Sequence, residues 1–439
     1  MVEKLTEFFE NKLSGPMEKI SQERHLRAIR DGIVATLPLI IVGSFFLIIA
    51  MPPLPQDWEI YKFLNGHAGT ILLPYRMTMF IMAVYATFGI GYSLAESYDL
   101  DKLTGGILSM IAFLCTITPV SVSADSNAGV SGWVMPMANL GGGGLFVSIV
   151  VSIIAVEVYR LTSKSKFKIK MPEQVPPAVA RSFEALTPTI VILVGMACIT
   201  YFLGFDWHLA ISKVVSPLVE AADSLPSVLL LVFLITFFWS FGIHGVSIIG
   251  SIARPLWLQL LDQNTAAAAA GQPLTAIAAE PFFQWFIWIG GSGCTIGLVI
   301  ALALFAKSSY GKQLGRAALV PGIFNINEPI IFGAPIVLNP TLIIPFIITP
   351  LVTATLAWIA TSVGLVSRVV VTAPWTLPGP IGAFVATGGD WKASVLNIIC
   401  IVISIVIYYP FVKIYDKKLL GEEQGEALEE NLVGSGSKN

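Results

Sequence analysis

Residues 393–412 read ASVLNIICIVISIVIYYPFV and contain no charged side chain. A membrane-spanning helix needs about 20 predominantly apolar residues in a row, so this stretch is long enough to cross a bilayer. Nine more charge-free runs lie at 32–56, 77–95, 103–124, 126–156, 185–205, 224–253, 281–306, 329–367 and 369–389. They are continuously apolar rather than alternating, which excludes a membrane β-barrel. The pattern predicts an all-α, polytopic membrane protein.

The composition agrees with this fold class. Of the 439 residues, 55% are hydrophobic and only 12% are charged, about half the roughly 25% typical of soluble proteins. So few charges cannot cover the surface of a soluble protein of this size, which excludes a water-soluble enzyme, a disordered chain and a coiled coil. The net charge of −2 gives no electrostatic reason to expect nucleic acid binding.

Basic residues predict the orientation of the chain. Residues 3–20 have the spacing of an amphipathic helix lying on the membrane surface. Arg24, Arg27 and Arg30 precede the first span, and five Lys or Arg residues lie within 160–170. Cytoplasmic loops are enriched in such residues. We therefore expect both regions, and both chain termini, in the cytoplasm. Nine clean spans are predicted, at 32–51, 74–95, 103–120, 143–160, 185–204, 225–243, 281–306, 341–366 and 393–412.

Three apolar segments contain too many glycines and prolines for uninterrupted helices, at 240–280, 308–340 and 369–391. The first of them is interrupted at Gly242, Gly245, Gly250 and Pro255. Irregular backbone at membrane depth occurs only where it is packed in protein or lines a cavity, and transporters build binding sites from interrupted helices. We therefore predict a scaffold domain over 1–215 and a substrate-binding domain over 216–415. A flexible cytoplasmic tail is expected over 416–439.

His244 is the histidine that the sequence marks as a candidate for binding. It lies in SFGIHGVS, at the end of an apolar run and directly before Gly245. Glycines permit sharp backbone turns and close approach of a ligand. The alternative is a structural histidine that is bonded to a carbonyl group. The other three histidines, His25, His67 and His208, are expected to be solvated or interfacial.

Glu328 lies in FNINEPIIFG and is the one acid between residues 281 and 389. An ionisable residue at membrane depth is costly and indicates function. The following proline suits the first turn of a helix, Asn327 is a suitable cap, and Asn325 precedes it. An ionised carboxylate at a helix start accepts hydrogen bonds from two hydroxyl groups, as a sugar would require. The alternative is a carboxylate at a helix start with no ligand.

Two further residues are weaker candidates for substrate binding. Trp375, in APWTLPGP, is placed to present its ring to a sugar, although tryptophans also populate the membrane interface. Asn139 lies in the polar loop segment MPMANLGGGG.

Several motifs are missing from the sequence. It contains no GxxxxGK[ST], no GxGxxG and no HExxH, so nothing indicates a nucleotide or a metal ion. Cys115, Cys198, Cys294 and Cys400 are too far apart in the chain for a metal pattern and are expected to be small packing residues. We expect no cofactor.

The segments WSFGIHG, NINEPIIFG and PWTLPGPIG resemble the membrane IIC (permease) component of the bacterial phosphoenolpyruvate-dependent sugar phosphotransferase system, lactose/cellobiose/diacetylchitobiose family. The resemblance implies about ten transmembrane helices, two re-entrant hairpins and a homodimer in the cell membrane, formed by the first half. It implies a β-linked disaccharide substrate, bound at the family positions matched by His244 and Glu328, which would also serve the reaction. A separate IIB protein, supplied by IIA, would phosphorylate the sugar, and no residue of this chain would carry the phosphoryl group.

Two other classes of function remain alternatives. An ion-coupled secondary transporter or a channel would be expected to carry further buried carboxylates, and only Glu328 is deep. An integral-membrane enzyme without transport would need a second catalytic group near Glu328, and His244 is the one available.

Overall fold

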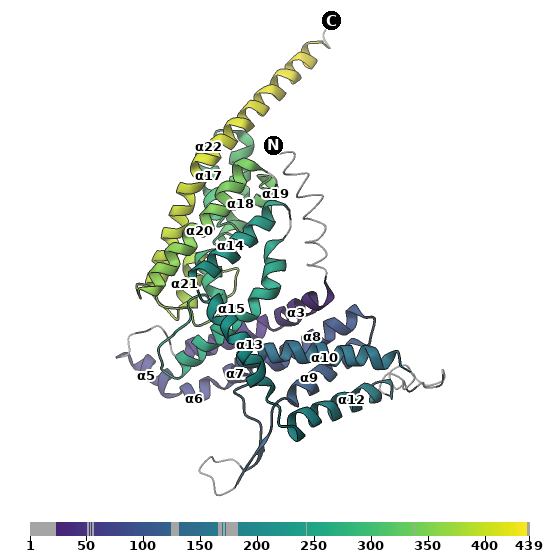
Figure 1. The fold of residues 1–439 in the computed structure, drawn as a ribbon. Helices are drawn as coiled ribbons and strands as arrows, with labels where there is room; N and C mark the ends of the chain where they lie inside the picture. Colours follow the sequence, from purple (N-terminus) through teal and green to yellow (C-terminus); the bar gives the residue numbers. More distant parts are fainter. Residues whose placement is uncertain are drawn as a thin grey trace. The chain divides into compact units, whose positions relative to one another are not determined.

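The computed structural model describes residues 23–50, 57–123, 131–165, 183–242, 244–337 and 339–436, with the single residues 52, 54, 169 and 172. It is mostly helical (Figure 1). The amphipathic helix predicted over 3–20 lies outside the described residues. So do residues 166–168 and 170 of the basic stretch and 124–130 of the polar loop.

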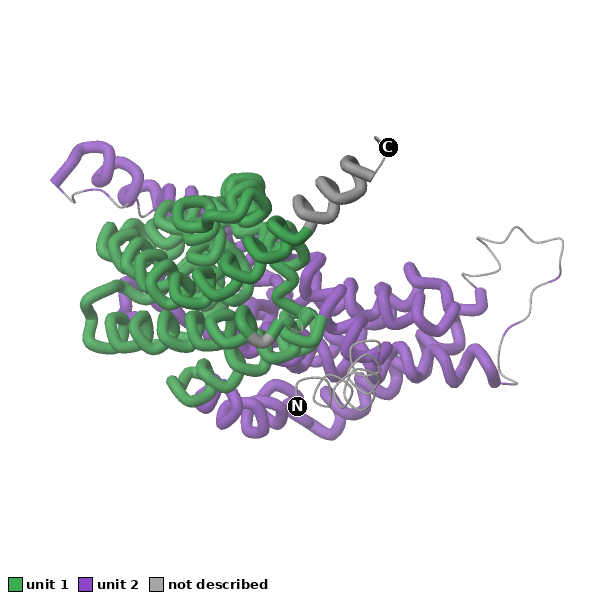
Figure 2. Tube along the Cα trace, turned by 90° about the horizontal axis from the view of Figure 1, so that it is seen from above, with its two compact units in different colours: residues 1–18, 223–249, 275–439 green, residues 19–222, 250–274 purple. Residues whose placement is uncertain are grey.

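The chain forms two compact units (Figure 2). Among the described residues, unit 1 comprises 223–249 and 275–436, and unit 2 comprises 23–222 and 250–274. The first unit therefore holds most of the second half of the chain, and residues 250–274 belong with the first half.

Unit 2 is a bundle of helices with a small β-hairpin between residues 114 and 142, and it includes α15 (Gly245–Ala269) from Gly250 onward. Its helices are α3 (Arg24–Val34), α4 (Leu37–Ala50), α5 (Glu59–Gly66), α6 (Ala68–Ile71), α7 (Leu73–Arg76), η2 (Met79–Ile81), α8 (Met82–Ser97), α9 (Lys102–Leu114), η3 (Gly142–Gly144), α10 (Leu145–Ser163), α12 (Leu186–Ala197), η4 (Cys198–Phe202) and α13 (Trp207–Ala222). The strands β1 (Val120–Val122) and β2 (Gly132–Val134) pair antiparallel.

Small residues let the helices of unit 2 approach closely. A Cβ atom on Gly32 of α3 would lie 2.4 Å from the Ile90 nitrogen of α8, and one on Gly91 would lie 2.6 Å from the Gly105 oxygen of α9. Membrane helices pack through such positions because lipid supplies no hydrophobic force between them. Glycine at these positions therefore sets the packing of α8 against both neighbours.

Unit 1 contains α14 (Leu225–Ser240), the start of α15 (Gly245–Ala269), α16 (Glu280–Phe286), α17 (Ile296–Phe305), α18 (Ser309–Ile323), α19 (Glu328–Gly333), α20 (Pro340–Ser362), α21 (Gly379–Ala386) and α22 (Trp391–Gly436). α22 packs against α17, α20 and α21. Its Asp416 carboxylate accepts hydrogen bonds from the Lys307 and Ser308 amides, at 2.7 and 3.0 Å. These bonds fix the start of α18 to the C-terminal helix.

In the described part of the chain, five helices are long and apolar enough to cross a membrane: Arg24–Ala50, Ala68–Ser97, Gly142–Ser163, Thr341–Ser362 and Trp391–Gly425. Each overlaps a predicted span. A sixth candidate is the pair Leu186–Phe202 and Trp207–Ala222, which is bent by 84°. α9, α14 and α17 are shorter apolar helices. α9 ends at Leu114, before the end of the span predicted over 103–120, because the chain turns there into β1.

Two predictions about helix continuity were wrong. The span predicted over 281–306 is broken into α16 and α17, because Gly290, Gly291 and Gly293 adopt positive φ angles, which no helix accommodates. Conversely, Gly250 and Pro255 do not interrupt a helix, since α15 continues through both of them. The break predicted near Gly242 is real, since α14 ends at Ser240 and α15 begins at Gly245.

Candidate functional site

The irregular segment 287–295 forms the centre of unit 1. Gly290, Gly291, Gly293 and Cys294 all have positive φ angles, between 53° and 98°, and residues 287–295 are buried. α22 holds this loop from one side, because Ser404 donates to the Cys294 carbonyl at 2.7 Å and Tyr408 donates to the Gly293 carbonyl at 2.9 Å. A backbone of this shape needs such external hydrogen bonds, since it cannot satisfy its own polar groups.

Asn325 and Asn327 hold the same loop from the other side. The Asn325 side chain accepts from the Gly290 amide at 2.8 Å and donates to the carbonyls of Trp375 and Leu377 at 2.7 and 3.0 Å. Asn327 donates to the Ser292 carbonyl at 3.1 Å. Both side chains are buried. Asn325 therefore connects three irregular segments of the predicted substrate-binding domain.

These bonds correct one local prediction. Asn327 stands at the cap position of α19, but its side chain makes no capping hydrogen bond and is directed to Ser292 instead. Asn325 has a φ angle of 62°, a left-handed conformation that asparagine tolerates better than most residues. A direct contact of either asparagine with substrate stays a prediction.

We expect Asn325→Ala to destabilise the protein by roughly 3–5 kcal/mol, because it leaves a buried amide and two carbonyls without partners and places alanine at a positive φ. The measurement is thermal unfolding of the purified protein in detergent. Asn325→Gly removes the same side chain without the backbone strain and should be less damaging.

Asn339→Ala is the matched control, because Asn339 accepts from the nearby Thr341 amide at the start of α20 and loss of such a cap typically costs about 1 kcal/mol. If Asn325→Ala unfolded at the wild-type temperature while losing sugar binding, Asn325 would be a substrate contact rather than a structural one.

Glu328 is the first residue of α19 and is followed by Pro329, as the sequence predicts. Its side chain is exposed. Within the part of the chain that the structure describes, no hydrogen bond or ion pair of this carboxylate is found. Asn325 and Asn327 fix the backbone directly before Glu328, and its exposed carboxylate is available to a ligand.

Trp375 is linked to the same segment. Its backbone carbonyl accepts from Asn325, while its side chain is 52% exposed. The structure therefore brings Asn325, Asn327 and the backbone of Trp375 together around the loop 287–295. Glu328 directly follows Asn327 in the chain. An exposed indole ring on a fixed backbone can stack against a sugar ring.

His244 lies in the break between α14 and α15 and is exposed. The Ser247 amide donates to its Nδ1 atom at 3.2 Å, which places the proton of the neutral ring on Nε2. The ring lies 4.5 Å from the ring of Trp239, measured between centroids. His244 is therefore oriented by two neighbours, with the proton of the neutral ring on Nε2.

Local geometry explains why glycine occupies positions 242 and 245 near His244. A Cβ atom on Gly245 would lie 2.0 Å from the Ile235 oxygen of α14, so no larger residue fits. Gly242 has a φ angle of 78° and lies next to Val337, with 3.3 Å between its ideal Cβ and a Val337 methyl group. Since Val337 follows α19, the break that carries His244 adjoins the segment that carries Glu328.

Asn139 belongs to unit 2 and lines a pocket of about 370 Å³ together with Asp206, His208 and Gln259. The sequence predicts His208 to be solvated or interfacial, but the residue is buried. Its Nε2 atom forms a hydrogen bond of 3.0 Å with the Thr116 hydroxyl group. A role of Asn139 in substrate binding stays a prediction.

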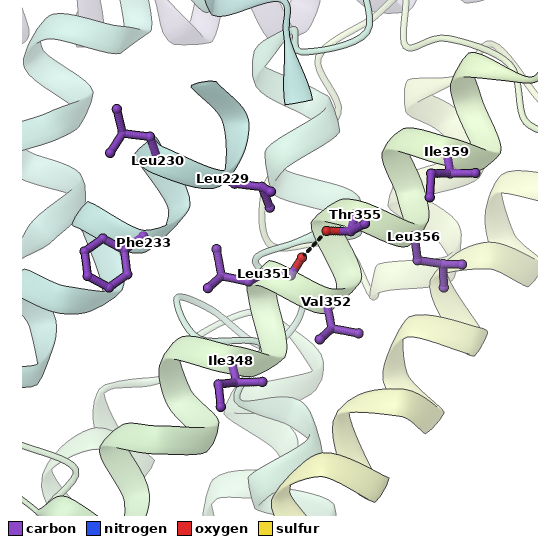
Figure 3. Close-up of a pocket in the computed structure, with 9 residues that line it drawn as sticks. All are labelled: Leu229, Leu230, Phe233, Ile348, Leu351, Val352, Thr355, Leu356 and Ile359. Carbon is purple, nitrogen blue, oxygen red and sulfur yellow. Dashed lines mark hydrogen bonds between the residues drawn. The ribbon is translucent and has the colours of Figure 1, made fainter. Parts of the chain in front are cut away.

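A larger groove of about 710 Å³ lies between α14 and α20. Figure 3 shows its lining of leucine, isoleucine, valine and phenylalanine side chains, with Thr355 as the one polar residue. The Thr355 hydroxyl donates to the Leu351 carbonyl of its own helix at 2.8 Å. This groove offers a sugar no partner, and the site of interest is the polar region around Glu328.

Sequence reasoning missed several residues that shape this region. Trp239 lies within the motif WSFGIHG, so its position five residues before His244 was a usable signal. Asn397, Ser404 and Tyr408 lie in an apolar run and show regular helical spacing; Asn397 donates to the Trp285 carbonyl at 2.6 Å. Polar residues on one face of a membrane helix indicate contacts with a neighbouring segment.

Comparison with known proteins gives a consistent result. A family model described as "Phosphotransferase system, EIIC" matches residues 30–350. The chain is 40% identical to the lichenan permease IIC component of Bacillus subtilis (strain 168), over 99% of both chains. It is 39% identical to the cellobiose-specific EIIC component of Geobacillus stearothermophilus, over 93% of both chains.

A solved structure is similar over nearly the whole chain. It is the crystal structure of the transporter ChbC, the IIC component from the N,N'-diacetylchitobiose-specific phosphotransferase system. The TM-score is 0.88 with 39% sequence identity, covering 95% of this chain and 99% of that chain. These relatives do not favour the alternative of an ion-coupled transporter. The chain therefore belongs to the EIIC family of the phosphotransferase system.

Proposed function

We propose that the protein is a sugar permease that binds a β-linked disaccharide and moves it inward while a separate IIB protein phosphorylates it. The printed names of its relatives support the substrate class, since they include permeases for lichenan, cellobiose and N,N'-diacetylchitobiose. The observation that carries the proposal is the exposed carboxylate of Glu328 on a backbone fixed by Asn325 and Asn327.

In this proposal Glu328 accepts hydrogen bonds from two sugar hydroxyl groups. His244 donates from Nε2 to an oxygen at or near the hydroxyl that is phosphorylated. The exposed ring of Trp375 stacks on the sugar, and Gly245 permits its close approach. A contact of Asn139 with the sugar is proposed separately, since Asn139 belongs to unit 2. A neutral, polyhydroxylated ligand suits this set, because it combines one charged acceptor with neutral donors and an apolar face.

A IIB partner is suggested by a relative whose printed name joins the two components. The lactose-specific EIICB component of Staphylococcus epidermidis is 33% identical to it over 93% of this chain but only 70% of that protein. We infer that IIB, supplied with phosphoryl groups by IIA, binds this protein as a separate polypeptide.

We propose the finer architecture as well. The chain forms about ten transmembrane helices and two re-entrant hairpins. The broken segments α16–α17 and 369–391, which contains α21, are candidates for the hairpins. The scaffold domain, 1–215, forms a homodimer in the cell membrane. Residues 216–415 carry the sugar, and 416–439 form the cytoplasmic tail, through which α22 continues to Gly436.

A binding screen tests the substrate class. Purified protein is titrated with cellobiose, N,N'-diacetylchitobiose, lactose, maltose, glucose and mannitol. We expect the strongest binding from one of the three β-linked disaccharides and at least about tenfold weaker binding from maltose. Exclusive binding of monosaccharides or hexitols would reject the proposed substrate class.

The orientation is tested by labelling single cysteines in intact cells. In a Cys198→Ser background, Ser165→Cys and Gly425→Cys should not react with a membrane-impermeant maleimide until the membrane is permeabilised, because both positions are expected in the cytoplasm. Ser131→Cys, next to β2, is expected outside and serves as the reactive control. Reaction of residue 165 or 425 in intact cells would overturn the predicted topology.

A further inference from the structure

The polar pocket that Asn139 lines belongs entirely to unit 2, whereas Glu328 belongs to unit 1. Its volume is about 370 Å³, at the lower end of the roughly 300–1,000 Å³ typical of small-molecule sites. α13 contributes His208 and Ser212, which are four residues apart and so share one helix face. The other walls come from the segment before η3, from α10 and from Gln259 of α15.

Hydrogen bonds define the protonation of the His208 ring, of which only 8% is exposed. The Thr116 hydroxyl donates to the Phe113 carbonyl at 2.6 Å. Because a hydroxyl group has one proton, Thr116 accepts in its 3.0 Å contact with Nε2 of His208. In the neutral ring, which burial favours, Nδ1 is therefore an acceptor. Nδ1 is shielded from solvent and has no hydrogen-bond partner in the described part of the chain.

A second acceptor of this kind belongs to another residue that lines the same pocket. The side-chain carbonyl oxygen of Gln259, Oε1, is also shielded from solvent and makes no hydrogen bond to any described residue. Nearly all buried polar groups in proteins have a partner, and each exception calls for an explanation such as a bound molecule or ion. Two such acceptors on residues of one pocket indicate an occupant that donates hydrogen bonds.

The remaining lining groups indicate the charge of that occupant. Among the described residues that line the pocket, Asp206 is the one that carries a charge, so an anion would be repelled. One oxygen of its carboxylate accepts from the Leu209 amide at 2.9 Å and caps α13. Asn139 and Ser212 add an amide and a hydroxyl group, and Phe146 adds an aromatic ring. A protonated amine would leave these neutral donors unused, whereas a polyhydroxylated molecule matches donors, acceptors and ring alike.

We propose that this pocket is a second sugar-binding site, in which hydroxyl groups on one ring of a disaccharide donate to Nδ1 of His208 and to Oε1 of Gln259. The assignment rests on the proposed function, because the names of the relatives supply the sugars that the protein is expected to meet. It adds a site in unit 2 to the one proposed around Glu328 in unit 1. The two sites use different residues, so each can be removed without the other.

The experiment is photoaffinity labelling of the purified full-length protein with cellobiose or N,N'-diacetylchitobiose that carries a diazirine group, followed by peptide mapping. We expect labelled peptides from α13 and from the segment around Glu328, and an excess of the unmodified sugar should abolish both. Gln259→Met removes the acceptor but keeps the shape, so it should reduce labelling of α13 by about tenfold or more and leave labelling around Glu328 unchanged. His208→Phe should have the same effect, and Glu328→Gln the opposite one.

Gln263→Met is the matched control, since it makes the same change at an exposed position one turn further along α15, and it should be labelled as the wild type is. Labelling of α13 that survives both Gln259→Met and His208→Phe would overturn the second site and leave the proposed function intact, as would wild-type labelling around Glu328 alone. Labelling of α13 alone would support the second site and count against the one around Glu328. Absence of labelling by either sugar would reject both sites. Displacement of the α13 label by ethanolamine but not by the unmodified sugar would show that the pocket takes an amine, and it would also overturn the proposal.

Discussion

Glu328→Gln is expected to weaken disaccharide binding by about 10- to 100-fold without unfolding the protein. A hydrogen bond to a charged group is worth roughly 1.5–3 kcal/mol, and each 1.4 kcal/mol corresponds to a factor of about ten in affinity. Glutamine keeps the shape of the side chain, but its neutral amide oxygen accepts hydrogen bonds more weakly than a carboxylate does. The carboxylate makes no hydrogen bond or ion pair in the described part of the chain, so the substitution should cost little stability.

The measurement is equilibrium binding of the disaccharide by calorimetry, together with the thermal unfolding temperature of each variant. Glu422→Gln is the matched control, since it makes the same change at an exposed position of α22 and should bind sugar normally. A folded Glu328→Gln protein with wild-type affinity would remove this carboxylate from the binding site.

His244→Ala is expected to reduce sugar binding and sugar phosphorylation by the same factor, on the order of tenfold. The Ser247 amide occupies Nδ1, so the neutral ring presents a donor rather than a base. Loss of one donor to a buried oxygen costs about 1–2 kcal/mol. His244→Gln, whose amide retains a donor, should recover part of both activities.

Both quantities must be measured on the same preparations, by calorimetric binding and by phosphoryl transfer at saturating sugar with phosphorylated IIB. General-base catalysis typically contributes about 10²–10⁴ in rate. If phosphoryl transfer by His244→Ala fell by such a factor beyond the loss of binding, His244 would be a base, and the donor assignment would be wrong.

The sequence predicted the helical class of the protein and several of its spans, because span length and charge distribution are local properties. The helices around 32–51, 74–95, 143–160, 341–366 and 393–412 are confirmed as long apolar helices. The predicted membership of the phosphotransferase IIC family is also confirmed. The break inside 281–306 was missed because its three glycines add no charge and leave the segment apolar overall. Their positive φ angles nevertheless end the helix.

The continuity of α15 was missed for the opposite reason. Gly250 and Pro255 each disfavour a helix, by about 1 and 3 kcal/mol, and local propensity therefore predicted a break. Tertiary context commonly overrides such local preferences. The chain instead breaks at 241–244, next to Val337.

For the candidate site, the sequence predicted which residues matter better than it predicted what they do. Glu328 was expected at a helix start, and the structure confirms that placement. The capping role of Asn327 was wrong because its partner, the Ser292 carbonyl, lies 35 residues away in the chain. Likewise, the link from Asn325 to Trp375 and Leu377 depends on three segments meeting in space, and a pattern along one segment carries no information about such contacts.

The measurement that tests the central claim most directly is transport by the purified protein in sealed proteoliposomes. Labelled disaccharide is supplied outside. Inside are IIB, IIA and the general phosphotransferase proteins with phosphoenolpyruvate, or these are omitted and a sodium or proton gradient is imposed. We predict that sugar phosphate accumulates inside only with phosphoenolpyruvate, at a rate that neither gradient changes. Uphill accumulation of unmodified sugar, driven by an ion gradient in the absence of IIB, would contradict the account.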